Sequence, residues 1–128
     1  MAWKIDGDRL SLEPAVALAA SRAVKLGGTA GEIEYAGKGD ESHCIGVTDY
    51  AATSTAEATS VRLRNRGGVA EVTASAGIDA HAKVSLASDG RVATTTAAGP
   101  IFGVALEAAS GDGSIIPVLL MAGTDDST

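Results

Sequence analysis

The chain has 128 residues, with 16 glycines, one Trp, two Tyr and one Phe, and a net charge of −6. This length suits a single domain and excludes a large enzyme with separate cofactor and substrate domains. The excess of acidic over basic residues disfavours nucleic acid as a partner, since binding to it depends on neutralising phosphates. It disfavours an anionic membrane surface for the same reason. With so few large side chains, packing against neighbouring subunits would be a natural supplement to a small core.

The first segment, residues 1–11, is expected to form a polar N-terminal arm with one large anchor, Trp3. We expect Trp3 either to cap the core of the protein or to anchor an interface, where tryptophan is often a hot spot. Acidic residues stand where a signal peptide would have its apolar core, which predicts synthesis in the cytoplasm. No apolar run reaches the ~20 residues that span a bilayer.

Residues 12–24 fit either one short helix or irregular structure, because Pro14 and the alanines favour a helix start whereas some apolar residues alternate. From Val24 onward, short alternating segments are separated by turns rich in Gly, Asp and Ser. Strands are predicted at 23–26, 32–35, 43–48, 60–66, 69–74, 83–87, 91–96, 101–106 and 115–121. This spacing is typical of a small barrel or sandwich. The predicted fold class is therefore mainly β, with at most one or two short helices.

An internal repeat divides the predicted β-rich domain, residues 12–122, into two related β units at roughly 12–66 and 69–122. Gly46 and Gly103 are expected to mark a bend or a close backbone approach in a curved strand. The last residues, 123–128, are expected to form a flexible polar tail. In the repeat, Leu18, Ala20, Val24 and Leu26 match Ile78, Ala80, Val84 and Leu86 at a spacing of 60, Ile45-Gly46-Val47 matches Phe102-Gly103-Val104 at a spacing of 57, and Val61 and Leu63 correspond loosely to Pro117 and Leu119.

The second unit contains Asp-Gly-Arg-Val at 89–92, Pro-Ile-Phe-Gly-Val-Ala-Leu-Glu-Ala-Ala at 100–109 and a Val-Leu-Leu strand at 118–120. With these motifs, residues 12–121 resemble a family of small phage proteins encoded beside the major capsid gene. Several of its members resemble capsid decoration, or cement, proteins, similar in role to the lambdoid head decoration protein. Trp3 and the acidic tail after Met121 depart from the family pattern.

The resemblance implies a small β-barrel or β-tulip-like domain without catalysis and without a cofactor. It implies a position on the capsid surface of the virion after synthesis in the host cytoplasm. The implied partners are the major capsid protein and the chain itself, as a homotrimer at threefold or quasi-threefold axes.

We find no pattern for a catalytic, cofactor-binding or metal-binding site. His43 and His81 are 38 positions apart and Cys44 is the single cysteine, so no metal-ligand spacing is present. Cys44 is predicted to be a small buried hydrophobe. Glu32 and Glu34 would share one side of a strand, where they repel each other or bind a cation, although exposure to solvent is the expected state.

Three arginines form the one prominent polar pattern. Arg62, Arg64 and Arg66 alternate along a predicted strand, so they would line one face of it. Such a row suits docking against an acidic partner surface, because a guanidinium pairs bidentately with carboxylates. The alternative is a solvated strand face paired with acids such as Glu71. Together with Trp3, the three arginines are the candidate capsid or subunit interface.

Three functions are open on these observations. The first is a decoration protein that binds the outer surface of a viral capsid and stabilises it. The second is another virion component, such as a tail or fibre-base protein. The third and least favoured is a small ligand-binding β-barrel, which would need a concave site with converging polar groups.

Overall fold

The computed structural model describes residues 4–6, 9–49, 51–52, 59–64, 68–95 and 99–126. In these residues the chain is mainly β, in two sheets of six and five strands. The helical segments there are short 3-10 turns, among them η1 (Glu41–His43) and η3 (Ser88–Gly90). None of the helices in this part of the chain has the length and apolar character needed to cross a membrane. The predicted fold class is confirmed.

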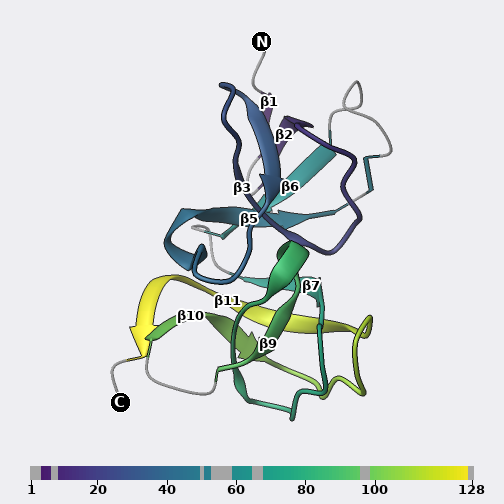
Figure 1. The fold of residues 1–128 in the computed structure, drawn as a ribbon, viewed down its shortest axis with the longest axis vertical. Helices are drawn as coiled ribbons and strands as arrows, with labels where there is room; N and C mark the ends of the chain where they lie inside the picture. Colours follow the sequence, from purple (N-terminus) through teal and green to yellow (C-terminus); the bar gives the residue numbers. More distant parts are fainter. Residues whose placement is uncertain are drawn as a thin grey trace.

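The first sheet, which we call unit 1, has the strand order β1-β2-β4-β3-β5-β6. It forms the upper half of the molecule in Figure 1. An additional pairing between β2 and β6 joins five of these strands in a ring. Neighbours are antiparallel except β2 and β4, which run parallel. The strands are β1 (Lys4–Asp6), β2 (Arg9–Pro14), β3 (Ala23–Leu26), β4 (Glu32–Tyr35), β5 (Cys44–Thr48) and β6 (Thr59–Leu63).

Strand β2 begins at Arg9 and pairs with β1, so the segment expected to form an N-terminal arm contributes strands to the first sheet. Of the two structures considered for residues 12–24, the irregular one is found at 15–22, between the end of β2 at Pro14 and the start of β3 at Ala23. Pro14 ends a strand here, where its missing N–H is tolerated, instead of starting a helix.

The second sheet, which we call unit 2, has the order β7-β11-β10-β8-β9. Among the described residues, its two end strands, β7 and β9, meet through an isolated bridge between Ala74, just after β7, and Val92. The sheet is thus a curled half-barrel. The strands are β7 (Val69–Thr73), β8 (Lys83–Leu86), β9 (Val92–Thr94), β10 (Gly99–Ala105) and β11 (Ile115–Asp126).

The segment expected to form a polar tail contributes to the second sheet. Strand β11 runs to Asp126, and its last residues pair with Gly99–Ile101 of β10. The polar residues 123–126 are therefore part of the second sheet. Residues 127–128 lie outside the described residues.

Apart from β1, each strand of unit 1 has a counterpart in unit 2 with the same neighbours. Val24 pairs with Gly46 on the neighbouring strand, and Val84 pairs in the same way with Gly103. Thr48 faces Val61 in unit 1, and Ala105 faces Val118 in unit 2. The matching of Thr48–Val61 with Ala105–Val118 shifts the alignment of the two repeats by one residue. Val61 and Leu63 therefore correspond to Val118 and Leu120, and not to Pro117 and Leu119 as predicted.

Gly46 and Gly103 stand where two strands approach closely. A Cβ at Gly46 would lie 2.1 Å from the carbonyl oxygen of Arg62, and a Cβ at Gly103 would lie 2.3 Å from that of Leu119. Both distances are far below van der Waals contact, so any side chain would push the strands apart. Glycine therefore sets the same close crossing in both units.

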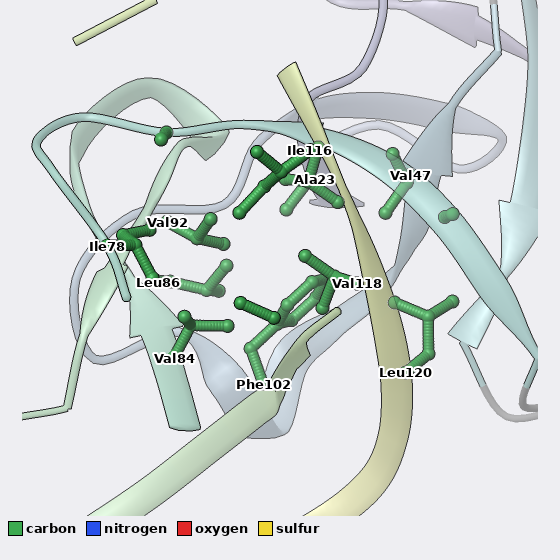
Figure 2. Packing of buried hydrophobic residues seen from close by; sticks show 14 of the residues in the cluster. Ala23, Val47, Ile78, Val84, Leu86, Val92, Phe102, Ile116, Val118 and Leu120 are labelled. Carbon is green, nitrogen blue, oxygen red and sulfur yellow. The ribbon is translucent and has the colours of Figure 1, made fainter. Parts of the chain in front are cut away.

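The core has two parts of unequal size. A small cluster inside unit 1 contains Leu18, Val24, Ile33 and Val61. The larger cluster surrounds Phe102 in unit 2 and also contains side chains from unit 1, including Ala23 and Val47 (Figure 2). Unit 1 therefore closes the core of the half-barrel.

The contact between the units is built from hydrogen bonds as well as apolar packing. The carbonyl oxygen of Ser21 accepts the N–H of Thr73 at 2.8 Å, and that of Ala36 accepts the N–H of Gly90 at 2.9 Å. We call the side of unit 1 formed by Ser21, Ala23, Ala36 and Val47 its packing face. We call the part of unit 2 formed by Thr73, Leu86 and Gly90 its receiving edge.

Candidate interaction surface

In the structure, Arg62 and Arg64 do not form a row on an exposed strand face. Arg62 pairs with Val47 of the packing face, so the side of β6 that carries Arg62 is turned toward unit 2. Arg64 lies just beyond the end of β6 and is only 4% exposed. Arg66 and Trp3 lie outside the described residues. Arg64 therefore cannot line an exposed face with Arg62, and it is an internal residue.

The buried guanidinium of Arg64 joins the two units. Its Nε donates to the carbonyl oxygen of Met121 at 2.6 Å and its Nη2 to that of Ile101 at 2.8 Å, both in unit 2. Its Nη1 donates to the carbonyl oxygen of Glu41 in unit 1. The same group lies over the ring of Phe102, 5.2 Å from its centroid. Burial lowers the pKa of Arg64 from its ordinary value. Arg64 is thus an internal tie between the units.

A hollow of about 190 Å³ opens between the units beside Arg62. Its walls carry both charges, with Asp49 and Arg62 from unit 1 and Glu71 from unit 2. Ser60 donates to the Asp49 carboxylate at 3.0 Å. The remaining lining residues are Ser21, Val47, Thr48, Val69 and Ala70. The hollow is a polar notch at the junction of the two units.

The outer side of unit 2 carries apolar side chains. Leu119 of β11 is 42% exposed and pairs directly with Val69 of β7 and Val104 of β10. Residues paired directly across strands share one face. The next rung brings Leu106 beside Pro117, through the hydrogen bond from the Leu106 N–H to the Pro117 carbonyl at 2.9 Å. Glu71, paired with Pro117, and Lys83, paired with Val104, lie on the same side. We call the apolar part of this surface, with exposed Ile115 at its end, the apolar face.

The apolar face was not among the predicted sites, although the sequence contains a signal for it. Residues 115–121 form an unbroken apolar run, whereas a strand with one solvated face alternates. Ile116, Val118 and Leu120 are buried, so Ile115, Pro117 and Leu119 point outward. An exposed apolar surface of this kind marks an interaction site.

The described residues offer little for catalysis or metal binding. No group of three or more His, Cys, Asp or Glu among them could hold a metal ion. Burial raises the pKa of the Cys44 thiol to about 11, so the thiol is protonated at neutral pH and a poor nucleophile. His43 and His81 are exposed and lie on different units.

Comparisons with known proteins agree with this architecture. A family model described as "phage cement protein" matches residues 5–120. Among solved structures, the chain is similar to the N base of head fiber gp8.5 in bacteriophage phi29, with a TM-score of 0.73 and 17% sequence identity. The match covers 91% of this chain and 95% of that one. At this identity the likeness shows the fold alone. No curated protein matches the sequence.

Proposed function

Because this chain belongs to the phage cement protein family, we propose that it binds the outer surface of a phage capsid and stabilises the shell. The family makes it a capsid-associated structural protein of the virion. Beyond this, we propose that the chain binds the outer surface of the shell, that its direct partner is the major capsid protein, and that binding reinforces the shell. The single observation that carries it is the family match, which extends over nearly the whole chain.

The structure supports a role in which surfaces, and not an enclosed site, perform the function. Arg64 ties the units together through carbonyls on both sides, which keeps their outer surfaces in a fixed relation. The apolar face is available for contact with a neighbour. Arg62, with Trp3 and Arg66 from the sequence analysis, stays a candidate for contact with acidic groups of the capsid.

We propose three copies as the working unit, at a threefold or quasi-threefold position of the shell. Several modest contacts made at once hold much more tightly than each contact alone, because later contacts form at high effective concentration. Such a unit would link adjacent capsomers without any catalytic step. We also propose that the chain is synthesised in the host cytoplasm.

Heads assembled without the protein provide the test. Purified protein is added to expanded heads, binding is measured by co-sedimentation, and the melting temperature of the heads is recorded. We expect saturable binding and a higher melting temperature. Arg64→Met protein, with its units loosened, serves as the comparison and is expected to stabilise heads less. Failure to bind, or binding with unchanged melting, would contradict the proposal.

A second candidate is a fibre base on the head, which is favoured by the fold shared with the head fiber N base of phage phi29. Both candidates attach to the shell, so co-sedimentation does not separate them. Reconstruction of the particle by cryo-microscopy does. A cement protein gives density lying on the shell, whereas a fibre base gives density that continues outward, and density on the tail would contradict both.

A further inference from the structure

The two units of this chain share a fold, yet only one pair of their matching surfaces is in contact. The packing face of unit 1 lies against the receiving edge of unit 2. By the repeat, unit 2 has its own packing face and unit 1 has its own receiving edge. Neither of these second surfaces is covered by the described part of the chain.

The packing face of unit 2 is found by the register of the strands. Val104 stands where unit 1 has Val47, and Lys83 stands where unit 1 has Ala23. Ala23 and Val47 are buried against unit 2, whereas Lys83 is exposed and Val104 half-buried. Leu119, beside Val104, extends this surface into the apolar face.

The receiving edge of unit 1 is found in the same way. Leu26 faces Ile33 as Leu86 faces Val92, so Leu26 is the counterpart of Leu86. Leu86 is 3% exposed beneath unit 1, but Leu26 is 53% exposed. Gly31 has a φ of 83°, close to the 72° of its counterpart Gly90. The same edge is thus present in unit 1 with its leucine uncovered.

The charges on these two surfaces are complementary. On the receiving edge, Glu13 replaces Thr73, and it pairs in register with Glu32 of β4. Two carboxylates directly opposite each other repel and destabilise a strand pair. On the packing face, Lys83 replaces Ala23. A lysine placed against this edge would neutralise the repulsion between the two glutamates.

We propose that unit 2 of one copy packs on unit 1 of the next copy, head to tail. The contact joins Lys83, Val104 and Leu119 of one chain to Leu26, Glu13 and Glu32 of its neighbour. This inference rests on the proposed function, for which it supplies the contact between copies. Head-to-tail contacts close into a ring when the rotation between copies allows it.

The contact between copies differs in strength from the contact within the chain. Thr73 gives its N–H to Ser21 of unit 1, but the N–H of Glu13 is already bonded to the carbonyl of Gly31 at 3.3 Å. The contact between copies lacks that hydrogen bond and depends on leucine burial and ion pairs. We therefore expect association that weakens as salt rises and strengthens on the shell, where copies are concentrated.

Cross-linking between two single-cysteine variants tests the orientation. Arg22 of unit 1 donates to the Asp89 carbonyl of unit 2 at 3.0 Å, and the counterparts of these residues are Ala82 and Ala30. A tagged Ala82→Cys protein is mixed with untagged Ala30→Cys protein and treated with a short bis-maleimide, in solution and on heads. Wild-type protein, with Cys44 buried, is the control.

We expect the mixed Ala82→Cys and Ala30→Cys product to exceed either homotypic product in at least one of the two settings. Lys83→Glu should lower its yield about fivefold or more, and adding Glu32→Lys should restore it. Homotypic products in excess, or no product in either setting, would overturn the head-to-tail contact. If heads bind the protein but the mixed product is absent, the head-to-tail contact fails and the proposed function stands. If the mixed product forms but heads do not bind the protein, the proposed function fails and the head-to-tail contact stands.

Discussion

Units 1 and 2 have the same strand order and differ in what covers their outer sides. Unit 1 closes its ring through a two-residue parallel pairing of β2 with β4, and it buries Ala23 and Val47 against its neighbour. In unit 2 the matching contact is a single bridge between Ala74 and Val92, and this unit leaves Val104 and Leu119 at the surface. A repeated fold thus provides matching surfaces, and changes at a few side chains decide which of them are used inside the chain.

The largest expected effect comes from cutting the tie between the units. Arg64→Met leaves three carbonyls without their donor, so we expect a loss of about 4 kcal/mol in the free energy of unfolding. Urea unfolding followed by circular dichroism measures it. The control is Arg62→Met, on the same side of β6, with an expected loss below about 1 kcal/mol. Equal losses would show that Arg64 does not join the units.

The two equivalent leucines sharpen the comparison. Leu86→Ala removes a side chain buried between the units, with an expected loss of about 3 kcal/mol. Leu26→Ala, at the matching position of unit 1, should cost less than about 0.5 kcal/mol in dilute protein. Both values come from denaturant unfolding at low protein concentration. A similar cost at the two sites would contradict the difference in coverage.

The equivalent glycines should behave alike. Gly46→Ala and Gly103→Ala each force two strands apart, and we expect each to cost about 2 kcal/mol. Thermal unfolding provides the measurement. Gly28→Ala and Gly111→Ala, where an added Cβ meets nothing within 4 Å, are the controls, one in each unit. If only one of the buried glycines were sensitive, the close crossing would not be common to both units.

The smallest effect concerns pH and unit 1 alone. The N–H of Gly37 and the ammonium of Lys25 lower the pKa of Asp40 below its ordinary value of 3.8. The ionised form is favoured by folding, so its contribution to stability is present above that value and disappears as pH falls through the folded pKa. Asp40→Asn should therefore destabilise the protein at pH 7, and the gap to wild type should shrink below pH 4. A gap independent of pH would exclude this pairing.

Local signals explain what the sequence predicted well. Turn residues and alternation located most of the strands, and the spacings of 60 and 57 revealed the two units because matching positions use the same residue types. The errors came from nonlocal pairing. β11 continues to Asp126 because Gly99–Ile101 lies beside it, which no pattern at 123–126 indicates.

The candidate site shows the same limit. Alternation predicts that Arg62, Arg64 and Arg66 share one side of a strand, but it cannot tell what lies on that side. For Arg64 the answer is the second unit and not solvent. The exposure of Leu119 is likewise settled by which strands surround β11.

Reconstruction of decorated heads by cryo-microscopy tests the central claim most directly, namely that this chain is a capsid cement protein built from two units that join copies head to tail. We predict density on the outer surface of the shell, in which unit 2 of each copy contacts unit 1 of the next. Density on the tail would contradict the capsid role, and copies joined through like units would contradict the head-to-tail contact.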